Sequence, residues 1–240
     1  MHLVDLHSHV LPALDDGSPD MATSLAMLRT LAELGFARVT ATPHQKAAQF
    51  LPAWADVTRA RDQVRAVLAD AGMALELGLA AENYWDEVFF ARQKTAGFPC
   101  YDDGGAFLFE IPPEEVPAHL EDTLFHLHAK GHLPVMAHPE RCLPFRQDAD
   151  RLARLAQGCA LLVDLGAVAG YHGRPEARAA RRLLADRIAH AAATDVHAPE
   201  DVRAAAAGIA WIKKKLGEDA VKRLLDDNPR RILAGELPEA

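Results

Sequence analysis

The feature that most restricts how this sequence can fold is an alternation between short apolar runs and longer amphipathic segments. Seven apolar runs are typical of buried strands, at residues 3–6, 36–41, 74–79, 106–109, 133–137, 161–165 and 188–193. Helical spacing of apolar side chains marks residues 21–34, 57–71, 116–129, 148–157, 176–185 and 199–216, and a last pair at 218–226 and 229–234. Continuous apolar runs indicate parallel strands buried on both faces. The pattern predicts an α/β fold, either a (β/α) barrel or a doubly wound sheet.

Length and composition favour one domain. The chain has 240 residues, half of them apolar and a quarter charged, which is enough to bury a full core. It contains no low-complexity segment, no repeat and no clear linker. We therefore expect a single domain over residues 1–240, with a polar loop at residues 45–54.

Charge and hydropathy disfavour several classes of function. The formal net charge is −8, whereas a nucleic-acid-binding surface carries a basic footprint, so no nucleic-acid partner is expected. No apolar stretch approaches the ~20 residues of a membrane helix. The first residues also lack the basic and apolar regions of a secretory signal. We expect a cytoplasmic protein without a membrane span.

The cysteines argue against thiol chemistry. There are three, none in a CxxC pair, which favours a reducing compartment over a disulfide framework. A thiol-dependent tyrosine phosphatase needs an arginine six positions after its cysteine. The residues six positions after Cys100, Cys142 and Cys159 are Ala106, Asp148 and Leu165. A cysteine nucleophile is therefore excluded.

Metal-ligand residue types follow six of the seven predicted strands: Asp5, His7 and His9; His44; Glu82; Glu110; His138; and Asp195 with His197. In parallel α/β folds, the carboxyl ends of the strands build the site. Two glutamates could each bridge two ions, and a mixture of histidines and carboxylates suits Mn, Fe or Zn better than Mg or Ca. The sequence therefore predicts a cluster of metal ions at this edge.

The first strand end and the loop after it supply candidates of different weight. His7 and His9 lie two residues apart, so their side chains share one face of a strand and can hold one ion. Asp5 lies deeper on that face, where it suits orientation of a histidine better than ligation. Asp15 and Asp16 precede a glycine, which is also an ordinary turn. Chemistry alone does not choose between these two carboxylates.

Arg141 lies three positions after His138, in a loop over the same edge. An arginine there can donate two hydrogen bonds to phosphate oxygens; a salt bridge with Glu140 or Asp148 is the alternative. The remaining histidines lack the strand-end placement and are set aside: His2, His119, His126, His128, His132, His172 and His190.

The whole constellation resembles the PHP (polymerase and histidinol phosphatase) family. It is most similar to the bacterial manganese-dependent protein-tyrosine phosphatases of capsule and exopolysaccharide systems. The motifs that carry the resemblance are Asp5-Leu6-His7-Ser8-His9, Asp15-Asp16-Gly17, Thr42-Pro43-His44, Ala81-Glu82-Asn83-Tyr84, Phe109-Glu110, Ala137-His138-Pro139-Glu140-Arg141, Thr194-Asp195-Val196-His197 and Asn228-Pro229-Arg230-Arg231.

The resemblance implies a distorted seven-stranded (β/α) barrel, the PHP domain, with three divalent metal ions, Mn first and Fe or Zn as alternatives. It favours Asp16 over Asp15, places Arg141 near the phosphate or the leaving oxygen, and keeps Asp5 as an orienting residue. Lys46 stands where relatives carry a richer histidine and arginine cluster, so it is the candidate basic contact to substrate. The implied ligands are His7, His9, Asp16, His44, Glu82, Glu110, His138, Asp195 and His197.

The resemblance also implies a reaction. The expected substrate is phosphotyrosine on the tail of a bacterial tyrosine kinase that regulates polysaccharide export, with phosphate as a product. A metal-bridging hydroxide would attack phosphorus in line. Alternatives are a PHP phosphoesterase acting on a small monoester such as histidinol phosphate, a metal-dependent hydrolase of another bond, and a catalytically silent regulatory barrel.

Overall fold

The computed structural model describes residues 2–95 and 97–240. Its strands are β1 (Leu3–Ser8), β2 (Phe36–Ala41), β3 (His44–Gln45), β4 (Glu76–Leu79), β5 (Glu82–Tyr84), β6 (Ala106–Glu110), β7 (Leu133–Ala137), β8 (Ala160–Asp164) and β9 (Ala191–Ala193). Its α-helices are α1 (Met21–Glu33), α2 (Trp54–Asp70), α3 (Glu87–Lys94), α4 (Leu120–Ala129), α5 (Leu143–Gln147), α6 (Ala149–Leu155), α7 (Leu165–Ala169), α8 (Arg174–Ala185), α9 (Asp201–Leu216), α10 (Glu218–Lys222) and α11 (Asn228–Leu233). Short helical turns are η1 (Tyr101–Asp103), η2 (Pro139–Arg141) and η3 (Arg223–Asp227).

The strands form two sheets in which every pair is parallel. One sheet has the order β1-β2-β4, and the other has the order β3-β5-β6-β7-β8-β9. The amide of Asp195 donates to the His7 carbonyl at 2.9 Å, and the amide of His9 donates to the Val196 carbonyl at 2.9 Å. These bonds join the end of β1 to the segment after β9. The two sheets thus meet along this seam.

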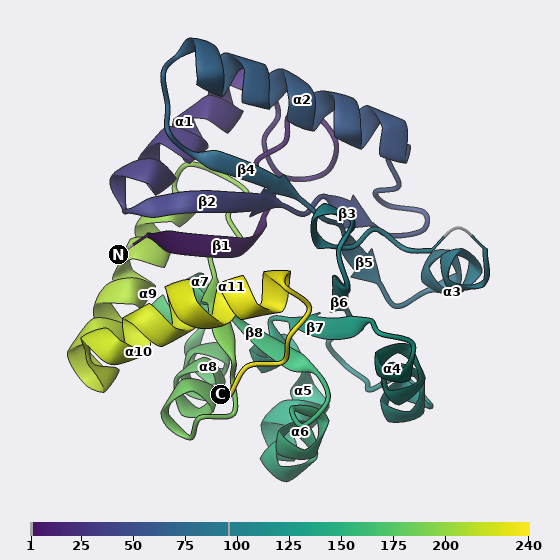
Figure 1. The fold of residues 1–240 in the computed structure, drawn as a ribbon. Coiled ribbons are helices and arrows are strands. Elements are labelled where there is room, and N and C mark those ends of the chain that lie inside the picture. Colours follow the sequence, from purple (N-terminus) through teal and green to yellow (C-terminus); the bar gives the residue numbers. More distant parts are fainter. Residues whose placement is uncertain (1, 96) are drawn as a thin grey trace.

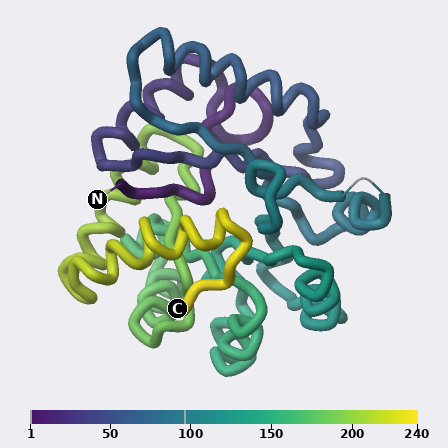
Figure 2. Tube along the Cα trace, viewed as in Figure 1, coloured from purple at the N-terminus to yellow at the C-terminus, as the bar shows by residue number. Residues whose placement is uncertain are grey.

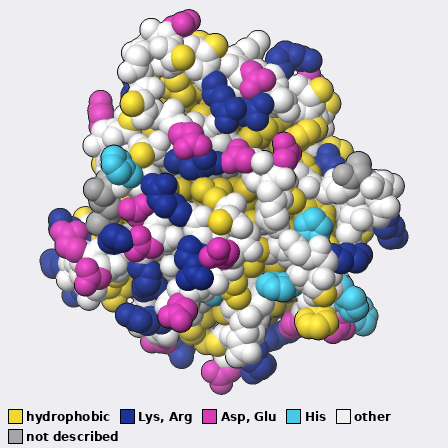
Figure 3. Space-filling model, in the orientation of Figure 1, with side chains coloured by type: hydrophobic (Ala, Val, Ile, Leu, Met, Phe, Trp, Pro, Cys, Tyr) yellow, Lys and Arg dark blue, Asp and Glu magenta, His cyan; other side chains and the backbone are white. Residues whose placement is uncertain are grey.

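Helices cover the outside of both sheets. Figure 1 shows α1 and α2 beside β2 and β4, whereas α4, α6 and α8 lie on the side of β7 and β8. The C-terminal helices run from α10 to α11, and the part from η3 to α11 contacts both β1 and β9. Figure 2 shows the same arrangement as a trace, with the C-terminal segment beside the first strand. On the face in Figure 3, acidic and basic side chains are interspersed.

The buried apolar side chains form two clusters, one between strands and helices and one enclosed by the strands. The enclosed cluster contains Val4 and Leu6 of β1, several alanines of β7 to β9, and Ile232 of α11. Tyr101 lies in this cluster and donates to the Leu6 carbonyl at 3.1 Å. The last helix, α11, lies at the amino-terminal ends of the strands, where Arg230 donates to the His2 carbonyl at 3.2 Å and Asn228 donates to the His190 carbonyl at 2.7 Å.

The prediction of an α/β fold with parallel strands is confirmed, and each of the seven predicted runs overlaps a strand. Two strands continue after a break, β2 into β3 across Pro43 and β4 into β5, which the apolar pattern did not indicate. The last residue of the run at 161–165 begins α7 instead of ending β8. Among the described residues, no helix is both long and apolar enough to cross a membrane.

Candidate metal centre

Nine side chains expected to be metal ligands lie together at the carboxyl ends of the strands. Their nitrogen and oxygen atoms form four overlapping groups, each with all its ligand atoms within 4.8 Å of one another. Because the groups share residues, they describe one continuous cluster. The groups are His9, Asp16, His44 and His197; His7, His9 and Asp195; His7, Glu82 and His138; and His44, Glu82 and Glu110.

Two of these residues are held in unusual backbone conformations. His138 follows β7 with φ of 34°, and Asp195 follows β9 with φ of 49°. Residues other than glycine rarely adopt positive φ, and such positions cluster at functional sites. The amide of His138 donates to the Leu162 carbonyl at 2.9 Å, and the amide of Asp195 donates to the His7 carbonyl at 2.9 Å. Neighbouring strands therefore fix both turns, which aim the two side chains at the cluster.

Glu82 lies at the middle of the cluster and is 1% exposed. Its carboxylate is 2.8 Å from His44 Nδ1, 2.9 Å from His138 Nε2 and 3.3 Å from His7 Nε2. Buried atoms without hydrogen-bonding geometry to any partner include His7 Nε2, His9 Nε2, His44 Nδ1, Glu82 Oε2 and Glu110 Oε2. Buried polar atoms are normally satisfied. Atoms of these types that converge without hydrogen bonds fit divalent cations.

The pKa shifts of His7 and Glu82 show that charged imidazole and carboxylate groups stabilise each other in this cluster. Burial lowers the pKa of His7, but the nearby carboxylates of Asp195 and Glu82 have the larger combined effect and raise it to about 10. Burial also opposes ionisation of Glu82, yet His7 and His44 hold the pKa of Glu82 well below its usual value. A metal binds neutral imidazole, so bound ions would take the place of these protons.

The two adjacent aspartates have different surroundings. Asp15 accepts hydrogen bonds from His9 Nδ1 at 2.8 Å and from the His44 amide at 3.1 Å. Burial raises the pKa of Asp15, but these partners prevail and lower it to about 2. Asp16 instead presents Oδ1 to the Nε2 atoms of His44, at 3.5 Å, and His197, at 3.6 Å. Asp15 thus orients a histidine, while Asp16 faces the cluster.

Asp5 is buried on β1 and binds the segment that follows β9. Its carboxylate accepts from the Thr194 amide at 2.9 Å and the Thr194 hydroxyl at 2.5 Å, and it approaches the His7 amide at 3.4 Å. The His7 ring is held by a different residue, since Nδ1 lies 2.6 Å from Thr42 Oγ1. We expected Asp5 to orient a histidine; it contacts the His7 backbone, while Thr42 holds the ring.

The two expected substrate contacts lie at the same cavity. This cavity of about 250 Å³ is lined by ligand-type residues together with Lys46, Gln49, Phe50 and Arg141. Lys46 Nζ lies 4.0 Å from the centre of the Tyr84 ring. One terminal nitrogen of Arg141 donates to Asp164 at 2.8 Å and to Asp195 at 2.5 Å. The predicted alternative partner for Arg141 was Glu140 or Asp148, so neither Asp164 nor Asp195 was foreseen in that role.

Sequence reasoning missed a histidine and an aspartate beside Arg141. His172 Nε2 lies 2.6 Å from Asp164 Oδ2 and 3.3 Å from Arg141. A second cavity of about 240 Å³ is lined by Arg141, Asp164 and His172, among others. Asp164 is the last residue of β8, the one strand for which no ligand-type end residue was considered. That strand-end position was a usable signal for Asp164. His172 comes from the loop after α7, and its position depends on tertiary structure.

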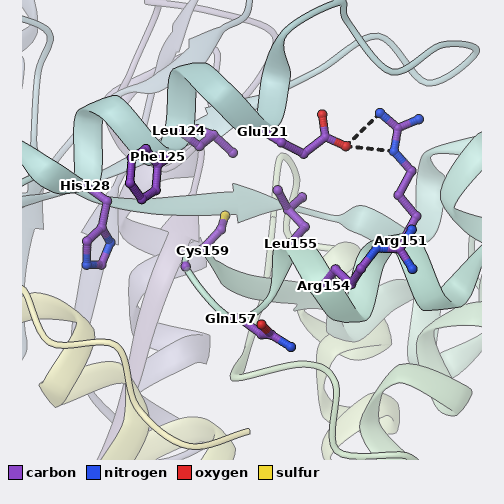
Figure 4. A pocket seen from close by; sticks show the side chains of 10 residues that line it. Glu121, Leu124, Phe125, His128, Arg151, Arg154, Leu155, Gln157 and Cys159 are labelled. Carbon is purple, nitrogen blue, oxygen red and sulfur yellow. Dashed lines mark hydrogen bonds and ion pairs between the residues drawn. The ribbon is translucent and has the colours of Figure 1, made fainter.

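A larger cavity, of about 500 Å³, lies between α4 and α6, away from the metal cluster. Figure 4 shows its lining, with Leu124, Phe125 and Leu155 around the cavity and Glu121 paired with Arg151. None of its lining residues belongs to the four metal-ligand groups of the described chain. The cavity of about 250 Å³ therefore remains the candidate site, because the ligand-type side chains line it.

Comparisons with known proteins agree with this geometry. Residues 3–234 match the family model of capsular polysaccharide synthesis proteins CpsB/CapC. The tyrosine-protein phosphatase YwqE of Bacillus subtilis is 31% identical over 199 residues, which cover 81% of this chain and 77% of YwqE. The tyrosine-protein phosphatase CpsB of Streptococcus pneumoniae is 25% identical over 248 residues, covering 98% of this chain and all of CpsB.

Solved structures share the fold of this chain. One from the study of YwqE and CpsB, described as metal-dependent tyrosine phosphatases, superposes with a TM-score of 0.89 at 27% identity, covering 98% of this chain and 95% of that chain. A lactonase from Listeria monocytogenes superposes with a TM-score of 0.55 at 13% identity, covering 99% and 95% of the two chains, which shows a shared fold alone. With nearly its whole length matched by the family model, this chain belongs to the CpsB/CapC family of capsular polysaccharide synthesis proteins.

Proposed function

We propose that this chain is a metal-dependent phosphatase that hydrolyses phosphotyrosine on protein substrates. The observation that carries the proposal is the convergence of nine histidine and carboxylate side chains on a cavity that Arg141 and Lys46 also line. Relatives along most of the chain are named tyrosine-protein phosphatases, which supports the substrate class.

The proposed cofactor is a set of three divalent ions, Mn first, with Fe or Zn as alternatives. The overlapping ligand groups and their mixture of imidazole and carboxylate support this choice. When bound, such ions neutralise phosphate charge and acidify a water molecule for attack on phosphorus. The proposed ligands are the nine residues named above; Glu82 belongs to two of the ligand groups and Glu110 to one.

The proposed role of Arg141 is to bind phosphate oxygens or the departing phenolate oxygen. Its guanidinium has five N–H donors, and the contacts to Asp164 and Asp195 use one terminal nitrogen. Donors therefore remain for the substrate, and the side chain is still 29% exposed. Lys46 supplies a second positive charge at the cavity. A phenolate is a good leaving group, so no strong general acid is needed.

The proposed physiological substrate is the phosphotyrosine-bearing tail of a bacterial tyrosine kinase that controls polysaccharide export. The proposed place of the reaction is the cytoplasm. The capsule family to which the chain belongs supports this proposal. We also propose that the two sheets act as one distorted seven-stranded barrel in a single domain. The hydrogen bonds between the ends of β1 and the segment after β9 support that closure.

The proposal is tested with protein stripped of metal and then loaded with Mn²⁺. We expect the loaded wild type to release phosphate from a phosphotyrosine peptide faster than from histidinol phosphate. His7→Ala should lose most of its bound metal and activity, because His7 belongs to two ligand groups. Arg141→Lys should keep its metal but lose about 100-fold in kcat/KM, since lysine cannot donate two parallel hydrogen bonds to the phosphate. Metal content is measured beside the kinetics.

His126→Ala is a suitable control, because His126 is an exposed histidine on α4 and lies outside the ligand groups. It should match the wild type in metal content and rate. Faster turnover of histidinol phosphate than of the phosphotyrosine peptide would replace the proposed substrate with a small monoester. A folded, fully loaded protein without activity on any phosphomonoester would refute the phosphatase assignment.

A further inference from the structure

The cavity over the metal cluster has one apolar wall. Among its lining residues that the structure describes, the side chains are charged or polar with the exception of Phe50. Phe50 is half-buried. Its ring lies nearly parallel to the His44 ring, with an interplanar angle of 17° and 5.7 Å between centroids. An aromatic side chain therefore stands directly beside an expected metal ligand.

The loop that carries Phe50 is held in place by its own backbone. The Lys46 amide donates to the Phe50 carbonyl at 2.7 Å, and the Phe50 amide donates back to the Lys46 carbonyl at 3.1 Å. Ala48 at the tip has φ of 60°, a conformation that non-glycine residues adopt only under constraint. The five-residue turn thus has a defined shape.

Contacts with a neighbouring helix fix the same loop from outside. The Ala47 amide donates to Asp86 Oδ2 at 2.8 Å. Asp86 also caps α3, since its other oxygen accepts from the Val88 amide at 2.9 Å. Arg92 of α3 donates to the Gln45 side chain at 2.6 Å. A ring positioned in advance loses little conformational entropy when it contacts a ligand.

Charge and apolar surface are arranged side by side at this cavity. Lys46, on the same loop, and Arg141 offer cations, and Phe50 offers an aromatic ring in the same lining. Phosphotyrosine joins a dianionic phosphate to a phenyl ring, whereas phosphoserine joins it to a small alkyl group. Aromatic pairs are favoured beyond the area that they bury. The lining therefore offers groups that suit both parts of an aryl phosphate.

We propose that Phe50 is a specificity-determining residue that contacts the phenyl ring of the substrate and makes the site favour aryl over alkyl phosphate monoesters. This inference rests on the proposed phosphatase function. The competing role is structural, in which Phe50 packs on His44 and only keeps that ligand in position. The two roles differ in their effect on alkyl substrates.

The test uses Mn-loaded wild type and the variants Phe50→Ala, Phe50→Leu and Phe50→Tyr. Leu51→Ala is the matched control, because Leu51 is the next residue, is 46% exposed and does not line the cavity. Calorimetry measures binding of phenylphosphonate and of methylphosphonate, which needs no turnover. Kinetics compare a phosphotyrosine peptide with the same peptide carrying phosphoserine.

We expect Phe50→Ala to weaken phenylphosphonate binding about tenfold and to raise KM for phosphotyrosine by a similar factor. Methylphosphonate binding, metal content and KM for phosphoserine should stay near wild type. Phe50→Tyr should restore aryl preference, Phe50→Leu should restore part of it, and Leu51→Ala should match the wild type.

Equal loss for aryl and alkyl ligands, or a loss of metal, would show that Phe50 only supports His44 and would overturn the inference. So would a wild type that binds the two phosphonates equally well. If the wild type prefers phenylphosphonate through Phe50 but does not hydrolyse phosphotyrosine, the proposed function fails while the assignment of Phe50 stands.

Discussion

Asp15 and Asp16 are adjacent in sequence, but their side chains have different partners and different expected roles. Asp16 faces His44 and His197, so Asp16→Ala should bind fewer metal ions per chain than the wild type. Asp15 accepts from His9 Nδ1, and an asparagine oxygen can still do so. We therefore expect Asp15→Asn to keep the number of ions but to bind them roughly 10–100-fold more weakly, as outer-shell changes usually do.

Metal content after gel filtration gives the number of ions, and titration calorimetry gives the affinity. Asp56→Ala, at an exposed position on α2, is the control for loss of a carboxylate. The assignment would be reversed if Asp15→Asn lost an ion while Asp16→Ala kept all of them.

Residues of the candidate site differed in how far the sequence could predict them. His7, His44, Glu82 and Asp195 were predictable because ligand residue types that follow apolar runs meet at one edge of a parallel sheet. Thr42, which holds the His7 ring, and His172, which lies beside Arg141, carry no such pattern. Their roles depend on which loops the folded chain places together, and periodicity in one sequence does not report that.

At the level of elements, the apolar strands and most helices were predictable, including the short α6 and α11, whereas the short helices α3, α5 and α7 were not. The helix α3 (Glu87–Lys94) begins after Asp86, which caps it, but it has too few turns for a clear apolar stripe. The five residues of α7 follow β8 directly, and they continue the apolar run that marks that strand. Elements of one or two turns are stabilised by packing more than by their own periodicity.

The strand β9 begins next to a buried histidine whose neutral form the fold requires. His190 Nδ1 accepts a hydrogen bond from the Leu161 amide at 3.0 Å. Burial, with a further contribution from Arg223, lowers the pKa of His190 from 6.5 to about 4. Below pH 6.5 the unfolded chain therefore binds a proton that the folded chain does not. Stability conferred by neutral His190 is full above pH 6.5 and is lost as the pH falls toward 4.

We expect this histidine to account for about 3 kcal/mol of the loss in unfolding free energy between pH 6.5 and 4. Urea denaturation of metal-free wild type and His190→Gln, repeated across this range, isolates the effect. The glutamine oxygen can accept from Leu161 but does not titrate here, so the variant should show a flatter dependence on pH. Parallel curves for the two proteins would contradict the assignment.

At the level of the whole molecule, the candidate metal centre spans both sheets. His7 belongs to β1 of the smaller sheet, whereas Glu82 and Glu110 belong to β5 and β6 of the larger one. Hydrogen bonds also join the two sheets directly, including the bond from the Asp195 amide to the His7 carbonyl. Ions held by ligands from both sheets would add further cross-links at the open end of the strands. The C-terminal helix α11 already closes the opposite end through Ile232.

Metal binding should therefore stabilise the whole fold. A ligand that binds only the folded state, at 100 times its dissociation constant, contributes about 2.7 kcal/mol per site. For a chain of this size, each kcal/mol raises the melting temperature by about 2–4 °C, so Mn²⁺ should raise it by at least roughly 5 °C over chelated protein.

His7→Ala should show a smaller rise, because it removes a ligand on β1 that faces Glu82 and Asp195. His126→Ala should show the full rise. Thermal unfolding with Mn²⁺ and with chelator measures the difference for each protein. An equal rise in His7→Ala would mean that the stabilising ions bind elsewhere, and the proposed link between the two sheets would then be wrong.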